Sequence, residues 1–140
     1  MHPSVHARAT PDKPALIVAE TGETISYAAL DAQSNRAAHL FRGAGLAVGD
    51  TVALLLDNIP EFFGIVWGAQ RAGLFYVCIP AKLTAPEVEY IVRDSGAQLI
   101  IASAAMAGVA AALNDALPDI ARFIIGGAVP GWLRFEDAVR

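Results

Sequence analysis

Two spacings of hydrophobic residues alternate along this chain, one typical of strands and the other of helices. Between segments with apolar residues at helical steps of three and four, the chain has short, almost continuous apolar runs. These runs are Thr51–Leu56, Leu74–Ile79, Gln98–Ala102 and Phe123–Ile125. Because strands that alternate with helices form βαβ units, the pattern predicts an α/β fold. We expect three layers, with a mostly parallel sheet of about five strands and flanking helices.

The N-terminal part of the chain has a different pattern. Residues 1–14 are interpreted as a polar lead-in segment and residues 15–140 as one α/β unit. Ala15–Ala19 and Thr24–Ser26 are two short β-type runs separated by a turn sequence, so we expect an N-terminal β-hairpin. Ser26 then occupies the position of a helix N-cap.

Three further helix starts are expected from capping residues. Asn58 with Glu61, and Thr84 with Glu87, have the spacing of a capping box. Ser103 is expected to cap a helix that continues to residue 117. The helix after Asn58 is apolar on most sides, which predicts that it is deeply buried.

The sheet is expected to supply most of the core. Its core residues are predicted to be Val52, Leu54, Leu56, Phe75, Val77, Leu99, Ile101 and Ile124. Cys78, inside an apolar run and without a nearby basic group, is interpreted as another core residue. As the only cysteine, it excludes an internal disulfide framework and suits a reducing compartment, so a cytoplasmic location is expected.

Composition and charge narrow the function classes. The chain has 140 residues, of which 55% are hydrophobic and 17% charged, and its net charge is −4. With no run of basic residues, nucleic-acid binding is not expected. The uncharged stretch Ser95–Asn114 changes from a strand-like to a helix-like pattern, so no transmembrane segment is expected. The start Met1–Ser4 lacks the basic and apolar regions of a signal peptide.

The residues that could bind phosphate or metal do not form a recognisable motif. Gly43–Gly49 follows a predicted helix and precedes a strand, whereas a phosphate-binding loop needs the reverse order. His2 and His6 lie in the lead-in segment without a third ligand, and His39 stands alone on a helix face. No metal site is therefore expected.

Two groups of residues after the predicted strand Thr51–Leu56 leave alternatives open. Asp57 and Glu61 could form an acid–base pair, but a strand end and a helix first turn are ordinary positions for carboxylates. The aromatic residues Phe62, Phe63 and Trp67 fit either the core or the wall of a ligand site. Residue chemistry alone assigns no catalytic residue.

Blocks of sequence in a fixed order resemble the N-terminal part of the adenylate-forming (AMP-binding) enzymes, which include acyl-CoA synthetases, luciferases and peptide-synthetase adenylation domains. The similar blocks are Pro11–Leu16, Ile25–Leu30, Ser34–Ala38, Gly45–Ala53, Asn58–Phe62, Gln70–Gly73, Leu83–Ile91 and Asp94–Ala97. Within that group, Lys82–Glu87 is similar to the R-L-T-x-x-E block of fatty acyl-CoA synthetases. Cys78–Ala81 departs from the family pattern P-[IL]-[ND], which leaves the subfamily and the acid open.

The resemblance implies that the parent protein is an acid–thiol ligase, a long- or medium-chain fatty-acid–CoA ligase in kind. It would convert a fatty or other hydrophobic carboxylic acid, ATP and CoA to acyl-CoA, AMP and pyrophosphate, with Mg²⁺. Two alternatives are an adenylation domain of a peptide synthetase and a free-standing α/β module that binds without catalysis. The family's phosphate loop, its acidic ribose-binding motif and its catalytic lysine are absent from these 140 residues.

Four expectations follow for the chain itself. Phe135–Arg140 looks like the start of a helix, so we expect truncation of a longer protein. The 140 residues are expected to be inactive alone and to bind no cofactor. Self-association is expected wherever truncation exposes an apolar surface. The resemblance places Lys82 where some family members have a basic residue near the CoA phosphates, and a solvated surface lysine is the alternative.

Overall fold

A five-stranded parallel sheet forms the centre of the structure, a computed structural model that describes residues 2–140. Its strand order is β4-β3-β5-β6-β7, and every neighbouring pair is parallel. The strands are β3 (Thr51–Leu55), β4 (Phe75–Cys78), β5 (Leu99–Ser103), β6 (Ala121–Ile125) and β7 (Leu133–Arg134). The predicted α/β class is confirmed. Strand β7 was not located by the sequence pattern because two residues are too short to show one.

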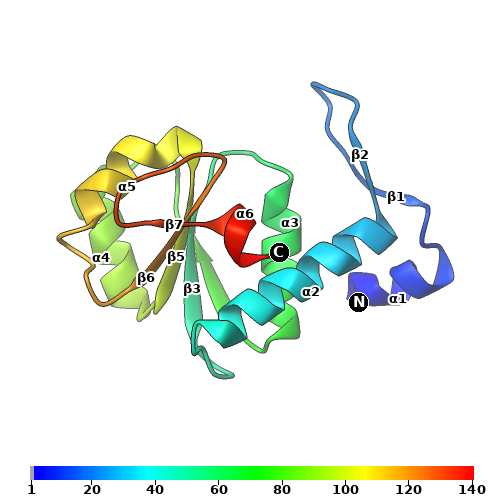
Figure 1. Ribbon diagram of the computed structural model, residues 1–140, viewed down its shortest axis with the longest axis horizontal. Coiled ribbons are helices and arrows are strands. Elements are labelled where there is room, and N and C mark those ends of the chain that lie inside the picture. The colour runs from blue at the N-terminus through cyan, green and yellow to red at the C-terminus, as the bar shows by residue number, and fades with distance from the viewer. Residues whose placement is uncertain (1) are drawn as a thin grey trace.

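Helices cover both faces of this sheet (Figure 1). On one face lie α2 (Tyr27–Gly43) and α3 (Glu61–Arg71), and on the other lie α4 (Ala85–Ser95) and α5 (Ala107–Leu113). A short helix, α6 (Phe135–Ala138), joins the α2–α3 side, where Phe135 is buried. The predicted three-layer arrangement is therefore confirmed. No helix within residues 2–140 is long and apolar enough to cross a membrane.

The central strands are apolar at successive positions because each face has its own core. In β3, Val52 and Leu54 face α2 and α3, whereas Ala53 and Leu55 face α4 and α5. All four side chains are 2% exposed or less. Successive residues of a strand point to opposite faces, so a strand covered on both sides needs apolar residues at every position. Of the predicted core, Val52, Leu54, Leu99, Ile101 and Ile124 are buried.

Strand β4 was predicted to be buried in the same way, and this prediction is wrong for most of it. The strand forms one edge of the sheet and pairs only with β3. Phe75 is 68% exposed and Cys78 is also exposed, so neither is a core residue. Val77 is partly buried, as is Leu56, which lies just beyond the end of β3. An apolar run does not distinguish an edge strand from a central one.

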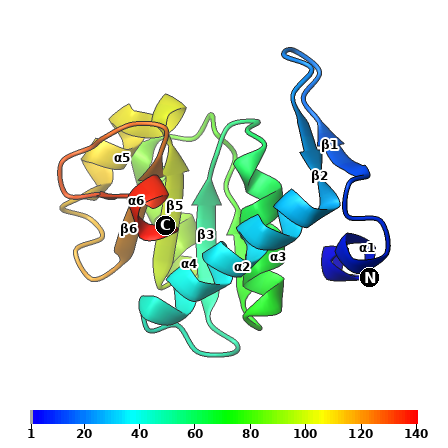
Figure 2. The same cartoon turned by 45° about the vertical axis from the view of Figure 1, so that its right-hand side comes forward.

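A two-stranded antiparallel hairpin, β1 (Pro14–Ile17) with β2 (Thr24–Ser26), projects from the body of the molecule (Figure 2). It confirms the predicted N-terminal hairpin. Ser26 also caps α2 as predicted, because its Oγ accepts a hydrogen bond of 3.2 Å from the backbone N–H of Ala29.

The lead-in segment contains a helix, α1 (Pro3–Ala9), that the sequence analysis did not assign. His2 is its N-cap: the Nδ1 atom accepts a hydrogen bond of 3.1 Å from the backbone N–H of Ser4. The His2 ring packs edge-on against Trp67 with ring centroids 5.3 Å apart. His6 lies 5.1 Å from the ring of Tyr27. These histidines therefore attach α1 to α2 and α3 instead of lying in a tail.

Two predicted helix starts differ from the structure. Helix α3 has Pro60 as its N-cap and no side-chain cap, so Asn58 and Glu61 form no capping box. Ser103 belongs to β5 and is buried, and its Oγ accepts a 3.2 Å hydrogen bond from the backbone N–H of Asp57. A turn of 3-10 helix (Ala104–Met106) precedes α5, which ends at Leu113 instead of continuing to residue 117.

The capping box at the start of α4 is confirmed and makes the stability of that helix pH-dependent. Glu87 Oε1 accepts hydrogen bonds from the backbone N–H and the hydroxyl of Thr84, at 3.1 and 2.8 Å. These bonds lower the pKa of Glu87 below its ordinary value. A lowered folded-state pKa contributes stability above the unfolded-state pKa, and that contribution is lost as pH falls through the folded-state pKa.

We therefore expect Glu87→Gln to lower the melting temperature at neutral pH and to have a smaller effect in acid. Thermal unfolding of wild type and variant across this pH range measures the difference. Glu89→Gln, on the same helix but outside the capping box, is the control and should lower the melting temperature less at neutral pH. A Glu87→Gln difference independent of pH would contradict the assignment of the cap to the ionised carboxylate.

Candidate functional site

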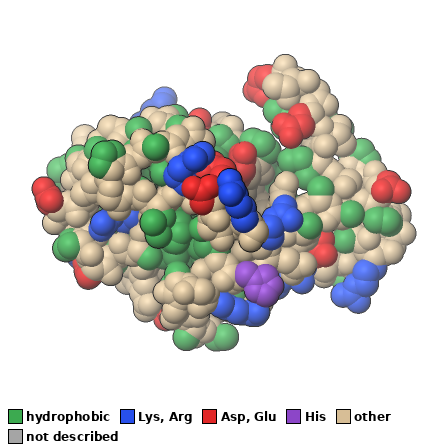
Figure 3. Space-filling model, in the orientation of Figure 1, with side chains coloured by type: hydrophobic (Ala, Val, Ile, Leu, Met, Phe, Trp, Pro, Cys, Tyr) green, Lys and Arg blue, Asp and Glu red, His purple; other side chains and the backbone are tan. Residues whose placement is uncertain are grey.

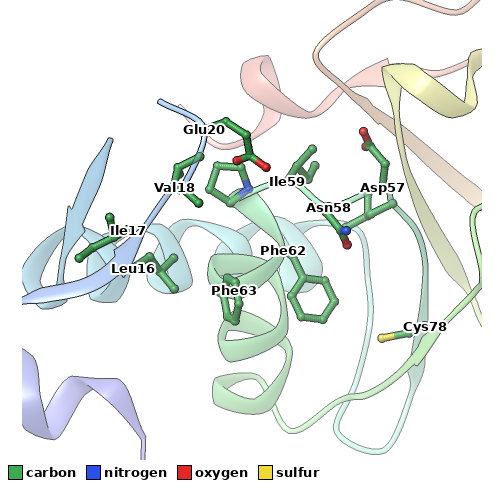
Figure 4. A pocket seen from close by; sticks show the side chains of 13 residues that line it. Leu16, Ile17, Val18, Glu20, Asp57, Asn58, Ile59, Phe62, Phe63 and Cys78 are labelled. Carbon is green, nitrogen blue, oxygen red and sulfur yellow. The ribbon is translucent and has the colours of Figure 1, made fainter. Parts of the chain in front are cut away.

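A cavity of about 620 Å³ opens where β3 and β4 end, between the hairpin and the start of α3 (Figure 4). Its position agrees with the general rule that parallel sheets bind ligands at the carboxyl ends of their strands. Of the two loops that follow β3 and β4 at this edge, only the first, Asp57–Pro60, lines the cavity. The remaining lining residues are Leu16, Ile17, Val18, Ala19, Glu20, Leu56, Phe62, Phe63 and Cys78.

The walls of the cavity are mainly apolar. Phe62 and Phe63 project from the first turn of α3 and meet edge to face, with ring centroids 5.4 Å apart. Phe63 remains 40% exposed, so this part of α3 is not deeply buried as predicted. Trp67 packs against the core on the α2–α3 side and does not line the cavity. Of the two interpretations of these aromatic residues, the cavity wall fits Phe62 and Phe63, and the core fits Trp67.

Polar groups reach the cavity from the loop after β3. Asp57 is fixed through its backbone N–H, which donates to Ser103 Oγ at the end of β5. Its Oδ1 atom is buried and has no hydrogen-bond partner within residues 2–140. In Figure 4 the carboxylate of Asp57 points away from Phe62 and Cys78. Glu61 lines a different cavity, between α2, α3 and α6, so the geometry does not bring Asp57 and Glu61 to one reacting point.

Cys78 lies opposite Phe62 across the cavity. Partial burial raises the pKa of its thiol, which disfavours the thiolate that nucleophilic chemistry requires. The apolar run around Cys78 predicted a core position and not a place in a cavity wall. Its position at the end of a predicted strand could have indicated the cavity. Because β3 and β4 are parallel, Cys78 and the loop after β3 lie at the same edge of the sheet.

Lys82 lies apart from the cavity, in the turn between β4 and α4. Its side chain is exposed and forms no ion pair with any residue in the range 2–140. An unpaired, flexible ammonium group can contact a phosphate without first breaking another interaction. The structure thus leaves Lys82 available for an anion without placing it near another ligand-binding group.

The starts of α3 and α4 at this edge of the sheet are poorly suited to the phosphates of ATP. At α4, the carboxylate of Glu87 already accepts from the backbone N–H of Thr84, where an anion would bind. At α3, Glu61 places a negative charge in the first turn. The glycine-rich segment with Gly45 and Gly49 precedes β3 and so lies at the opposite end of the sheet. These two helix starts and the glycine-rich segment therefore do not form a site for a nucleotide triphosphate.

No group of three His, Cys, Asp or Glu side chains within the described residues 2–140 is arranged to hold a metal ion. On the face shown in Figure 3, basic and acidic side chains are interspersed among exposed hydrophobic ones. The arrangement at the carboxyl edge can accommodate an apolar group between the hairpin and α3. It assembles neither a nucleophile with a base nor a phosphate cradle.

Comparison with known protein families shows to which family the chain belongs. The sequence profile described as "AMP-binding enzyme" matches residues 4–129, which is most of the chain. The chain belongs to the AMP-binding enzyme family. The family resemblance expected from the sequence blocks is confirmed.

Two relatives within the family are ligases of fatty acids. The fatty acid–[acyl-carrier-protein] ligase ScoC of Streptomyces coeruleorubidus is 40% identical over 97 residues, which are 69% of this chain and 18% of that protein. The long-chain-fatty-acid–CoA ligase FadD13 of Mycobacterium tuberculosis is 37% identical over 108 residues, 77% of this chain and 22% of that protein. The chain thus spans about a fifth of the length of these relatives.

Solved structures of family members have the same fold. The N-terminal domain of FACL13 from Mycobacterium tuberculosis has 31% identity and a TM-score of 0.79, covering 99% of this chain and 35% of that one. The anthranilate CoA ligase AuaEII, in complex with anthranoyl-AMP, has 26% identity and a TM-score of 0.86. In that case the match covers 99% of this chain and 27% of that one.

Proposed function

We propose that these 140 residues are the N-terminal part of an acid–thiol ligase. In such an enzyme a carboxylate attacks the α-phosphate of ATP, which releases pyrophosphate and forms an acyl-adenylate. A thiol then attacks the acyl carbon and releases AMP. The observation that carries this proposal is the family match over residues 4–129, together with a fold that covers 99% of the chain in solved ligases.

The acid we propose is a fatty or other hydrophobic one, and the thiol is that of CoA. The similarity to FadD13 supports both choices, and the similarity to ScoC favours an acyl carrier protein as a second candidate acceptor. ATP and Mg²⁺ would be held by parts of the enzyme outside these residues, because the carboxyl edge described above does not fit a nucleotide triphosphate.

The test is an assay of the polypeptide that continues beyond Arg140 in its gene. That polypeptide, ATP and Mg²⁺ are incubated with acids of increasing chain length and with either CoA or a phosphopantetheinylated carrier protein. We expect AMP release and a CoA thioester with the hydrophobic acids. If the thioester forms only on the carrier protein, then the acceptor is the carrier protein and not CoA. Preference for an amino acid would indicate a peptide-synthetase adenylation domain, and a gene ending at Arg140 would favour a non-catalytic module.

The 140-residue chain by itself is expected to show no adenylation activity. Within the described residues, the N-termini of α3 and α4 at the ligand edge already carry carboxylates, which disfavours binding of the triphosphate there. Acid-dependent exchange of radiolabelled pyrophosphate into ATP measures the reaction, with the longer polypeptide as positive control. Exchange above the no-protein blank would refute this expectation.

Lys82 is proposed to contact a phosphate of CoA in the complete enzyme. Replacing the ammonium group in Lys82→Ala should raise the KM for CoA by roughly five- to thirty-fold, the loss expected for one charge-assisted contact. Acid-dependent pyrophosphate exchange should not change, because that half-reaction precedes CoA binding. The matched control is Lys13→Ala, since Lys13 is the other lysine of the chain and is also exposed. A CoA KM within twofold of wild type would make Lys82 a surface residue only.

A further inference from the structure

The outer edge of β4 has the properties of a β-strand interface. The segment from Ala72 to Ala81 contains no charged residue. Phe75 is 68% exposed and Tyr76 is 45% exposed, although both lie within a strand. Proteins usually protect an exposed edge with a lysine, a proline or a bulge, and Phe75–Cys78 has none of these. This edge is thus open to pairing with another strand.

The hydrogen bonds of β4 show which backbone groups are free. The N–H groups of Phe75 and Ile79 donate to Asp50 and Leu54 on the β3 side, both at 2.8 Å. The backbone N–H and C=O groups of successive strand residues point alternately to the two sides of the strand. Those of Tyr76 and Cys78 therefore point away from β3, toward the open edge of the sheet.

We propose that two copies of this chain pair through β4 in an antiparallel arrangement, with Val77 on the two-fold axis. Tyr76 of each copy then lies opposite Cys78 of the other. This pairing forms four backbone hydrogen bonds, two for each Tyr76–Cys78 pair, and joins the two sheets into one of ten strands. The proposal does not depend on the ligase function.

The free backbone N–H groups of β4 favour this register over the two registers with the axis at an adjacent residue. A two-fold axis at Tyr76 would place Cys78 opposite Leu74, whose N–H already donates to Ala69 at 2.9 Å. An axis at Cys78 would place Tyr76 opposite Pro80, which has no N–H. With the axis at Val77, each outward donor meets a free acceptor. The uncharged segment also lets two copies approach without repulsion, although the chain carries a net charge of −4.

A four-residue edge buries little surface, so the dimer should be weak and should form at upper-micromolar concentrations. Sedimentation velocity of the 140-residue chain over a concentration series measures it. Tyr76→Lys should raise the dissociation constant at least tenfold, because it places two like charges across the axis. Tyr90→Lys changes a tyrosine on α4 that is even more exposed, at 67%, and should leave the dimer unchanged. A chain that stays monomeric at millimolar concentration would overturn the proposal.

Single-cysteine variants test the register directly. In an antiparallel sheet, residues of a non-hydrogen-bonded pair have Cα atoms about 4.5 Å apart, within the range for a disulfide. Val77→Cys in a Cys78→Ser background should therefore cross-link into dimers with oxidised glutathione. Native Cys78 and Phe75→Cys with Cys78→Ser should not, because those sulfurs lie away from their symmetry mates.

The most exposed position provides the control for random collisions. Phe75 is more exposed than Val77, so collisional cross-linking would favour cysteine at position 75. Stronger cross-linking at position 75 than at 77 would overturn the proposed pairing. A dimer that survives Tyr76→Lys would likewise place the contact elsewhere on the chain.

Discussion

Gly68→Ala is expected to lower the free energy of unfolding by about 2–3 kcal/mol, in the upper part of the range for overpacking a close contact. Gly68 lies where α3 crosses α2. A Cβ at this position would lie 2.6 Å from Ala37 Cβ and 2.8 Å from the carbonyl oxygen of Ser34. The second of these neighbours is backbone in the middle of α2, so it cannot rotate away. The two helices would have to separate, and equilibrium denaturation measures the cost.

A second helical glycine is expected to change the free energy of unfolding in the opposite direction. Gly108 is also helical, in α5, but apart from its chain neighbours and the backbone of its own helix no heavy atom lies within 4 Å of a Cβ at this position. Gly108→Ala should therefore stabilise the chain by about 0.5–1 kcal/mol, because alanine loses less backbone entropy in a helix. Equal effects of the two substitutions would show that helix propensity, and not the α2–α3 contact, determines the role of Gly68.

The fold was predictable from the sequence as far as local patterns determine it. Continuous apolar runs identified β3 and β5 correctly, and Ser26 and Thr84 were recognised as caps because their hydrogen bonds span only a few residues. The position of a strand within the sheet depends on contacts between distant segments. The same apolar pattern therefore gave the wrong burial for Phe75, which lies at an edge.

Side chains that bond across the fold were the other source of error. Ser103 looked like a helix cap, but it accepts a hydrogen bond from the backbone of Asp57, 46 residues away. His2 was placed in the lead-in segment without a structural role, and histidine is an uncommon N-cap. Its ring is instead fixed between Ser4 and Trp67, which is 65 residues away in sequence.

The candidate site was predictable only in part, for a similar reason. The loop Asp57–Pro60 follows a strand, and its place at the carboxyl edge of the sheet follows from βαβ topology. The opposite wall comes from the hairpin, through residues such as Leu16 and Ile17. No local pattern indicates how a hairpin is oriented against a distant sheet, so the enclosed volume could not be anticipated.

Phe41→Ala is expected to have a still larger effect on stability, about 3–5 kcal/mol, the usual cost of truncating a buried phenylalanine. Phe41 lies near the end of α2 and is 0% exposed in the core between that helix and the sheet. Since domains of this size have total stabilities of about 5–15 kcal/mol, the variant should unfold at much lower denaturant concentration.

Phe63→Ala removes the same side chain from the cavity wall and separates its two possible roles. Because Phe63 is already 40% exposed, its truncation leaves no sealed void and should cost less than half as much stability as Phe41→Ala. The cavity should nevertheless lose one face of its aromatic wall. Denaturation midpoints give the first comparison, and the fluorescence of an environment-sensitive apolar dye gives the second. A Phe63→Ala variant as unstable as Phe41→Ala would make this aromatic residue part of the core and would remove it from the candidate site.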